Sequence, residues 1–303
     1  MRNIRRLGAR FIRPINYLDY KISSWERSLF PIRFEGENDP NPLESLYSLI
    51  KSDVLILACY VNDEGDAHAL RYVLDEATKE FDLIIVVNTG RHILVVEPRF
   101  HYIQRPNFGR DLYSYALAVR FLILNQPRRI VLINDSVFWE SGALTRFWEL
   151  AQDSRFEILS MTDSKQGPYH LQSYAFCINQ VNNKTLIPFL ELVPCHFKRS
   201  LVEFGEKSLS QKWKRNGVKL GALWNSESFS ENIAKYISVY GEDAADLMKL
   251  IELKVPLNPT IHFWPELFVK TGIVKKSLID LNPARFSNLP KSLGEIKKFL
   301  SSQ

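Results

Sequence analysis

The sequence lacks the motifs that define several large classes of protein. It contains neither Gly-x-Gly-x-x-Gly nor Gly-x-x-x-x-Gly-Lys-Ser/Thr, so a dinucleotide-binding dehydrogenase and a P-loop ATPase lose their main sequence support. No stretch approaches the roughly 18 uninterrupted apolar residues of a membrane-spanning helix, and the N-terminus lacks the apolar core and cleavage site of a signal peptide. We therefore expect a cytoplasmic protein, either free or peripheral on the inner face of the membrane.

Cysteine is also scarce. The three cysteines among 303 residues are odd in number, widely spaced and set among apolar neighbours. This pattern favours reduced core thiols over a disulfide framework or a zinc site. With 46% hydrophobic residues, the chain can bury a large core, so we expect one large α/β domain or such a domain with appendages.

The net charge of +5 is concentrated at the N-terminus, where residues 1–33 carry eight basic side chains against two acidic ones. A nucleic-acid-binding protein more often spreads its positive charge over a binding face, so the nearly neutral remainder argues against nucleic acid as a partner. Apolar side chains share one helical face opposite the arginines: Ile4, Leu7, Phe11, Ile15, Leu18 and Ile22. This pattern predicts a helix on the inner-membrane surface or, equally, one docked on its own domain, with a kink at Pro14.

Turn-forming residues between 35 and 42 predict a linker. We therefore divide the chain into a basic amphipathic segment with its linker (1–42), a main domain (43–285) and a polar C-terminal tail (286–303).

The main domain is expected to begin with a strand–helix–strand unit. Apolar runs at 53–61 and 82–87 are typical of strands covered on both faces. The helix between them has a buried stripe marked by Ala69, Val73, Leu74 and Ala77. This order predicts a parallel sheet with a right-handed crossover. Further along we expect a helix at 143–151 and strands at 156–161 and 170–178.

The most informative stretch runs from 107 to 136 and combines a polar loop, a helix and a buried strand. Apolar spacing of three and four residues predicts the helix: Leu112, Tyr115, Ala116, Val119 and Leu122. The run at 129–133 predicts the strand, so Asn134, Asp135 and Ser136 fall at its carboxyl end. In open α/β sheets that edge binds ligands, because the loops after the strands converge there.

Two segments of this stretch, Asn-Phe-Gly-Arg-Asp at 107–111 and Ile-Asn-Asp-Ser at 133–136, resemble the rhamnan synthesis protein F family of bacterial polysaccharide and lipopolysaccharide O-chain assembly. Shorter matches follow in order between residues 50 and 285. The resemblance implies a GT-A-like glycosyltransferase fold, with a Rossmann-type, mostly parallel sheet flanked by helices. It also implies that the matched segments bind the sugar donor through Asn107, Gly109, Arg110, Asp111 and Asn134.

The acid at the strand end is more distantly similar to that of inverting family-2 glycosyltransferases, which usually carry Asp-x-Asp. This chain has Asn134-Asp135-Ser136 instead, so one of the usual acids is missing. Asp135 is our candidate ligand for Mg²⁺ or Mn²⁺, with the donor diphosphate completing the shell. Two alternatives stay open: Asp135 only caps the strand end, or no metal is needed and Arg110 with Lys or His side chains neutralises the diphosphate. Arg110 is either a phosphate ligand or the salt-bridge partner of Asp111.

Further donor contacts are expected from two later segments. His170 is a candidate for the donor phosphate, Gln172 and Ser173 for the sugar, and Asp163 for ordering the sugar pocket. Both charged residues have structural alternatives, since a histidine is often hydrogen-bonded beside a strand end and a carboxylate often opens a turn.

A downstream acid is expected to act as the general base, as in GT-A enzymes, by taking the acceptor's hydroxyl proton during attack on the anomeric carbon. Glu206 is our candidate for this base. Glu203 is the alternative, because both carboxylates can lie on one helical turn. A solvated surface role stays open for either residue.

Aromatic side chains gather in the C-terminal part of the domain: Phe263, Trp264 and Phe268. Aromatic residues beside loops often stack on sugar faces, so one interpretation is a wall of the acceptor site. The other interpretation is that they close the core at the far edge of the sheet, as large aromatic residues usually do.

Together these features predict a glycosyltransferase that moves a sugar from a nucleotide-diphosphate sugar to a lipid-linked polysaccharide or O-antigen precursor. Rhamnose as that sugar follows from the family's name alone. The alternative from another class is a non-catalytic GT-A-like subunit that binds other proteins of a polysaccharide assembly complex. Donor hydrolysis or sugar transfer would separate the two functions.

Overall fold

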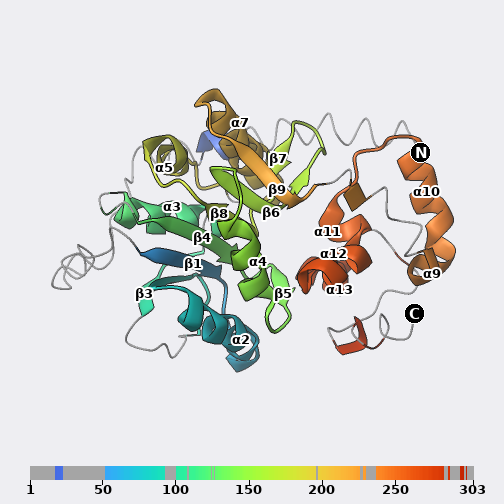
Figure 1. Ribbon diagram of the computed structural model, residues 1–303, viewed down its shortest axis with the longest axis horizontal. Coiled ribbons are helices and arrows are strands. Elements are labelled where there is room, and N and C mark those ends of the chain that lie inside the picture. The colour runs from blue at the N-terminus through green and yellow to red at the C-terminus, as the bar shows by residue number, and fades with distance from the viewer. Residues whose placement is uncertain are drawn as a thin grey trace.

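A mixed β-sheet is the centre of the structure, a computed structural model (Figure 1). The structure describes residues 18–22, 52–92, 100–107, 109–123, 125, 127–195, 197–225, 228–229, 237–282, 286, 294–296 and 298. In chain order, its strands are β1 (Asp53–Cys59), β2 (Leu83–Asn88), β3 (Phe100–Gln104), β4 (Arg129–Asn134), β5 (Val137–Trp139), β6 (Ile158–Ser164), β7 (His170–Leu171), β8 (Ala175–Ile178), β9 (Leu220–Trp224) and β10 (Ile273–Lys275).

The central sheet is mostly parallel. Its strands follow the order β3-β2-β1-β4-β8-β6-β7, and β9 pairs with β6. Strands β3, β2, β1 and β4 are parallel to one another, as β9 is to β6. Strand β8 runs antiparallel to β4 and β6, and β7 runs antiparallel to β6. The predicted α/β class with a mostly parallel sheet is therefore confirmed.

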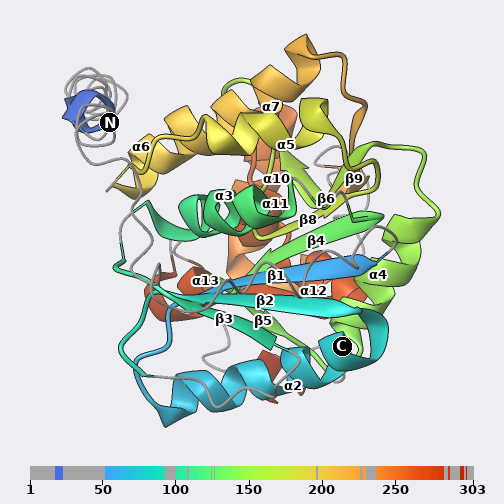
Figure 2. The ribbon, with the colours of Figure 1, turned by 90° about the vertical axis from the view of Figure 1, so that its left-hand side faces the viewer.

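Helices cover both faces of this sheet (Figure 2). One face packs against α3 (Arg110–Leu122), α5 (Asn183–Leu190) and α7 (Lys207–Arg215). The other face packs against α2 (Glu64–Glu80), α4 (Ala143–Gln152) and α12 (Trp264–Thr271). Successive side chains of a strand alternate between the faces, which is why the apolar run of β1 feeds both cores.

The remaining helices build the second half of the chain. They are α6 (Lys198–Leu201), the π-helix η2 (Val202–Glu206), α9 (Ile237–Tyr240), the 3₁₀-helix η4 (Gly241–Asp243), α10 (Ala244–Glu252), α11 (Pro259–His262) and α13 (Lys276–Leu281). Helices α9 to α13 gather at one end of the molecule (Figure 1). From there β10 returns to form an antiparallel pair with β5, which directly follows the end of β4.

Most expected elements are present near their predicted bounds. Strands β1 and β2 pair in parallel across α2, and all five residues of the predicted α3 stripe are buried. The stripe of α2 needs one correction, since Ala67 and Leu70 are buried and Ala69 is only partly so. The single strand expected at 170–178 is two strands, because residues 172–174 leave the strand conformation between β7 and β8.

The C-terminal aromatic residues belong to the core. Phe263, Trp264 and Phe268 are only 2%, 3% and 6% exposed. Their burial agrees with core closure and leaves no ring face for an acceptor sugar. The expected polar tail also contributes to this core, since Ile296 is fully buried in one cluster with Trp264 and Phe268.

The described part of the basic N-terminal segment, residues 18–22, docks on the domain. Asp19 accepts a hydrogen bond from the backbone N–H of Phe197 at 3.2 Å, and the Tyr20 ring stacks on Phe204 with centroids 4.5 Å apart. These contacts agree with the docked-helix alternative for this part of the segment. Residues 1–17 of the predicted helix and the predicted linker lie outside the described residues. Among the described helices, none is long and apolar enough to cross a membrane.

Candidate functional site

A pocket with a volume of about 370 Å³ opens at the carboxyl edge of the parallel strands. Tyr60, Thr89 and residues 134–136, which follow or end β1, β2 and β4, form what we call the strand-end wall. Parallel strands end at the same edge of a sheet, so these positions converge although they are far apart in the sequence. A second side, which we call the helical wall, comes from α6 and η2 through Lys198, Leu201, Val202 and Glu206.

The pocket brings together seven of the predicted site residues: Asn107, Arg110, Asp111, Asn134, Asp135, Ser173 and Glu206. The other predicted residues lie near it without lining it. They are Gly109, Asp163, His170, Gln172 and Glu203.

Backbone hydrogen bonds fix the strand-end wall. The N–H of Tyr60 donates to Asp135 Oδ2 at 2.8 Å. Asn134 is 2% exposed, and its Oδ1 accepts from the N–H and the hydroxyl of Ser136 at 3.0 and 2.6 Å. Burial raises the pKa of Asp135, while the charge of Lys276 acts in the opposite direction. Asp135 thus receives the hydrogen bond expected of a cap and also lines the pocket.

A polar chain joins the strand-end wall to the helical wall through Ser173. Asn134 Nδ2 donates to Asp111, which lies 3.3 Å from the Ser173 hydroxyl. The same hydroxyl lies 2.6 Å from Glu206 Oε1, which also accepts from the Ser173 N–H at 3.1 Å. A hydroxyl has one proton, so the shorter distance identifies Glu206 as its main acceptor. Tyr115 supports this loop from α3 by donating to the Ser173 carbonyl oxygen at 3.1 Å.

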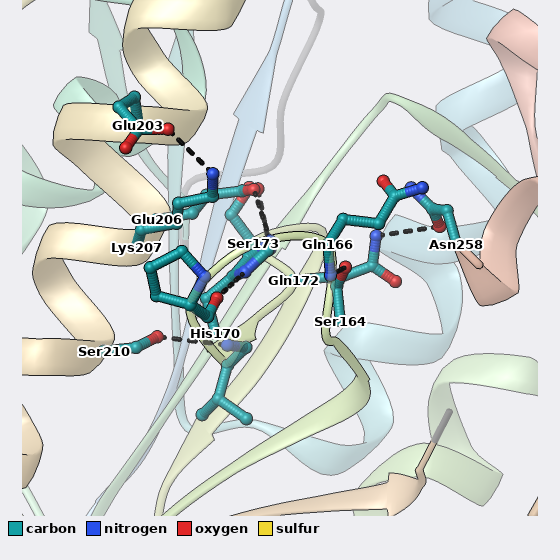
Figure 3. Close-up of polar contacts among 12 residues, drawn as sticks. Ser164, Gln166, His170, Gln172, Ser173, Glu203, Glu206, Lys207, Ser210 and Asn258 are labelled. Atoms are coloured by element: carbon teal, nitrogen blue, oxygen red, sulfur yellow. Dashed lines mark hydrogen bonds and ion pairs between the residues drawn. The ribbon is translucent and has the colours of Figure 1, made fainter. Parts of the chain in front are cut away.

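The two candidate bases point in different directions (Figure 3). Glu206 reaches the pocket and the Ser173 loop. Glu203 instead accepts from Lys207 at 2.7 Å, and its side chain is half exposed. Both residues lie in the π-helix η2, and of the two only Glu206 lines the pocket.

His170 lies next to Glu206 and does not line the pocket (Figure 3). It is 3% exposed, and its Nδ1 is 2.9 Å from the Pro168 carbonyl oxygen. A carbonyl oxygen only accepts, so Nδ1 carries the proton and Nε2 faces Glu206 Oε2 at 3.9 Å. His170 therefore contacts the site through Glu206.

Gln172 and Asp163 are also buried outside the pocket lining. Gln172 Oε1 accepts from Thr162 at 2.7 Å, and its Nε2 donates to Asn258 at 3.2 Å. These bonds connect β6 to the start of α11, and Figure 3 shows the second of them. Asp163 is 4% exposed and lies within β6, paired with Leu171, so it does not open a turn.

The N-terminus of α3 is shaped by a glycine and a buried arginine. Gly109 has φ +67°, and a Cβ there would lie 2.6 Å from the Cβ of Tyr113. Arg105, which the sequence analysis did not select, donates to the carbonyl oxygen of Arg110 at 2.5 Å and to Ser114 Oγ at 2.7 Å. Burial lowers the pKa of Arg105 to about 10. Arg105 therefore holds Arg110, which has a positive φ of 52°, at the rim of the pocket.

The pocket is lined by equal numbers of acidic and basic side chains. The acids are Asp111, Asp135 and Glu206, and the bases are Arg110, Lys198 and Lys275. Lys275 is not among the site residues predicted from the sequence. The alternative role of Arg110, a salt bridge to Asp111, is not formed between these two described residues, and Asp111 is hydrogen-bonded to Asn134 and Ser173 instead.

The donor atoms of this pocket do not fit a divalent metal held by the protein alone. Mg²⁺ and Mn²⁺ prefer several oxygen ligands. Asp135 offers one carboxylate, of which one oxygen accepts from Tyr60, while the Asn134 oxygen and the Ser136 hydroxyl bond to each other. Among the described residues, no group of three His, Cys, Asp or Glu side chains is placed to hold a metal.

The chain is similar in sequence to a protein of known name. The Virulence protein VirA of Vibrio anguillarum is 29% identical over 210 residues, which are 64% of this chain and 67% of that protein. No protein-family model matches the chain. The resemblance to the rhamnan synthesis family is therefore not confirmed by these matches.

The solved structures that are similar to this chain include three transferases. The glycosyltransferase GlyE of Streptococcus pneumoniae has a TM-score of 0.40 at 12% identity, over 82% of this chain and 60% of its own. A protein of Desulfovibrio desulfuricans described as a nucleotide-diphospho-sugar transferase has a TM-score of 0.37 at 12% identity, over 57% and 80%. A cytidylyltransferase of Francisella tularensis has a TM-score of 0.37 at 9% identity, over 57% and 90%. At these TM-scores the case for a function rests on the pocket itself.

Proposed function

We propose that the chain is a glycosyltransferase that moves a sugar from a nucleotide-diphosphate sugar to an acceptor hydroxyl. One observation carries the proposal: a carboxylate suited to act as a base, Glu206, lines the same pocket as three cationic side chains. Transfer of a sugar from a diphosphate needs both kinds of group, because a proton leaves the acceptor while negative charge grows on the leaving diphosphate.

Glu206 is the proposed general base. It accepts the proton of the acceptor hydroxyl as that oxygen forms its bond to the anomeric carbon. The bond from the anomeric carbon to the diphosphate breaks in the same step, and its electron pair leaves with the diphosphate. The two hydrogen bonds from Ser173 fix Glu206 Oε1, and the buried His170 lies beside Oε2.

The walls of the pocket divide the remaining work. Arg110 of α3 and Lys198 of α6 bring positive charge into the pocket. This charge offsets the negative charge of the leaving diphosphate. Asn107 and Asn134 line the same space and are proposed to contact the donor. The predicted Mg²⁺ or Mn²⁺ at Asp135, with a shell completed by the donor diphosphate, is given no step in this proposal, because the described residues place no group of three acidic, His or Cys side chains to hold a metal.

The acceptor and the sugar are proposed from the sequence resemblance. A lipid-linked polysaccharide or O-antigen precursor as acceptor, and rhamnose as sugar, follow from the resemblance to the rhamnan synthesis family. The basic N-terminal segment supports an inner-membrane location, since Lys and Arg near an anionic surface each contribute about 1 kcal/mol. Its described end docks beside α6, which contributes to the helical wall (Figure 2).

Thermal unfolding with a panel of nucleotide-diphosphate sugars tests this proposal. A donor at 100 times its dissociation constant stabilises the native state by about 2.7 kcal/mol, so one sugar nucleotide should raise Tm. Release of the nucleoside diphosphate should then be detected with water or a glycan as acceptor. A panel with no shift would overturn the proposal, and binding without release would favour the non-catalytic subunit.

A further inference from the structure

We propose that Lys275 joins Arg110 and Lys198 in supplying the positive charge that binds the donor diphosphate, in place of a divalent metal. The inference rests on the proposed function and deepens it, because it assigns a residue to diphosphate binding that the sequence motifs do not contain. It also gives a physical reason for a strand end with only one acid.

The fold places Lys275 beside the strand end through long-range pairing. Strand β10 is antiparallel to β5, with Lys275 opposite Val137, and the N–H of Lys276 donates to the Ser136 carbonyl oxygen at 3.0 Å. The register is held by apolar burial, since Ile273 is fully buried and Val274 is 1% exposed. A slip by one residue would exchange the faces of these side chains, so Lys275 has a defined direction.

Lys275 is bonded to the residue that follows the single acid. Its Nζ donates to Ser136 Oγ at 2.8 Å, and the Ser136 hydroxyl lies 2.6 Å from Asn134 Oδ1. The amide oxygen only accepts, so the hydroxyl proton points to Asn134 and the hydroxyl lone pair faces the ammonium. Ser136 thus orients Lys275, and one of the three N–H groups of the ammonium is used in this bond.

Burial and the neighbouring carboxylates act on the charge of Lys275 in opposite directions, and burial has the larger effect. Burial lowers its pKa, whereas Glu206 and Asp111 act in the opposite direction. The ammonium also lies 5.4 Å from the centroid of the Tyr174 ring, whose face attracts cations. A diphosphate in the pocket adds negative charge beside the ammonium and so favours its charged form.

A metal-free binding measurement tests the role of Lys275. Wild-type protein treated with EDTA is titrated calorimetrically with inorganic pyrophosphate and with a panel of nucleoside diphosphates and their sugars. Lys275→Met keeps an unbranched side chain of similar length and removes the charge. Lys276→Met is the matched control, because Lys276 lies next in the chain, contacts the Phe138 ring and does not line the pocket.

We expect wild-type binding to persist in EDTA and Lys275→Met to weaken it about tenfold or more, which corresponds to about 1.4 kcal/mol. Lys276→Met should stay within about twofold of wild type, and Lys275→Arg should recover part of the loss. Unchanged binding by Lys275→Met, or wild-type binding that requires added Mn²⁺, would overturn the inference. Should Lys275→Met fail to fold, Lys275→Gln and the EDTA titration of the wild type decide the question.

The same titrations separate this inference from the proposed function. If pyrophosphate binds through Lys275 and no sugar nucleotide binds, the anion site is supported and the glycosyltransferase function is contradicted. If sugar nucleotides bind equally well without the Lys275 charge, the glycosyltransferase function is supported and the role of Lys275 is contradicted. If no probe binds, both proposals are contradicted.

Discussion

The strand-end wall and the helical wall of the pocket hold their charged groups in different ways. In the strand-end wall, Asp135 accepts from the backbone of Tyr60, and its own N–H donates to the backbone of Ala58 in β1. In the helical wall, Glu206 is held by Ser173, which belongs to a turn 33 residues earlier in the chain. The first wall is part of the sheet framework, whereas the second depends on how a helical segment packs on it.

This difference separates the chemistry of the pocket from its stability. A change of charge on the helical wall leaves the sheet pairing intact, so it should alter the reaction more than the fold. A change of shape at the strand-end wall disturbs β1, β2 and β4 together, so it should alter the fold more than the reaction. Substitutions on each wall can test this division.

The largest expected effect on the reaction comes from Glu206→Gln. Glutamine keeps the shape and can still accept both hydrogen bonds from Ser173 through its side-chain oxygen, but it cannot take a proton from the acceptor. Transfer should fall by about 10²–10⁴ while donor binding persists. Steady-state kinetics and donor titration on the same preparation measure the two quantities.

Glu203→Gln is the matched control for that variant. It removes a carboxylate three residues away that pairs with Lys207 on an exposed face, so transfer should stay close to wild type and Tm should change little. Equal losses in both variants would show that the charge of η2 matters as a whole. Loss only in Glu203→Gln would move the base to that residue.

The next largest expected effect is on stability. It comes from replacing one of two glycines near the walls with alanine. A Cβ at Gly90, next to Thr89, would lie 1.9 Å from the Val61 carbonyl oxygen, so β1 or β2 must move. We expect Gly90→Ala to destabilise the fold by about 3 kcal/mol or more.

A Cβ at Gly205 in η2 would instead lie 2.6 Å from the tip of the Leu112 side chain, which can rotate. Alanine favours a helix over glycine by about 1 kcal/mol, so Gly205→Ala should shift stability by no more than about 1 kcal/mol in either direction. Chemical denaturation of both variants makes the comparison. A larger loss of stability in Gly205→Ala than in Gly90→Ala would contradict the division between the walls.

Much of the strand-end wall could be predicted from the sequence because its signals are local. The apolar spacing at 110–122 predicts a helix from a few turns of sequence, and the apolar run at 129–133 predicts a buried strand from a few residues. A polar residue after a parallel strand must fall at the carboxyl edge, so Asn134 and Asp135 were placed without any tertiary contact. Glu206 was expected from its position in the chain, and the direction of its side chain separates it from Glu203.

The residues that sequence analysis missed are placed by long-range contacts. Lys275 bonds to Ser136 across 139 residues, and its strand has only three residues, too short for a clear period of two. The sequence indicates this short strand only through the apolar pair Ile273-Val274, which lies between a glycine and two lysines. Arg105 was missed because it donates to two backbone carbonyl oxygens and to the hydroxyl of Ser114, a set of partners that no sequence motif reveals. Between β7 and β8, side chains occupy backbone groups of the chain: the Ser173 N–H donates to Glu206, and the carbonyl oxygens of Gln172 and Ser173 accept from Ser160 and Tyr115.

The smallest expected effect comes from Asp135→Asn on the strand-end wall. Asparagine can still accept the Tyr60 N–H through its side-chain oxygen, and it removes a carboxylate whose pKa is raised by burial. A raised pKa means that the folded state disfavours the charged form, so a neutral side chain should leave Tm unchanged or slightly higher. In EDTA, donor binding should be equal to wild type or slightly tighter, because one negative charge near the diphosphate is gone.

Asp135→Ala is the control for this variant. It loses the hydrogen bond as well, so it should lower the free energy of unfolding by about 1 kcal/mol. If the asparagine variant instead lost a binding step that Mn²⁺ supports in the wild type, Asp135 would be a metal ligand, and the division between a structural strand-end wall and a chemical helical wall would not hold.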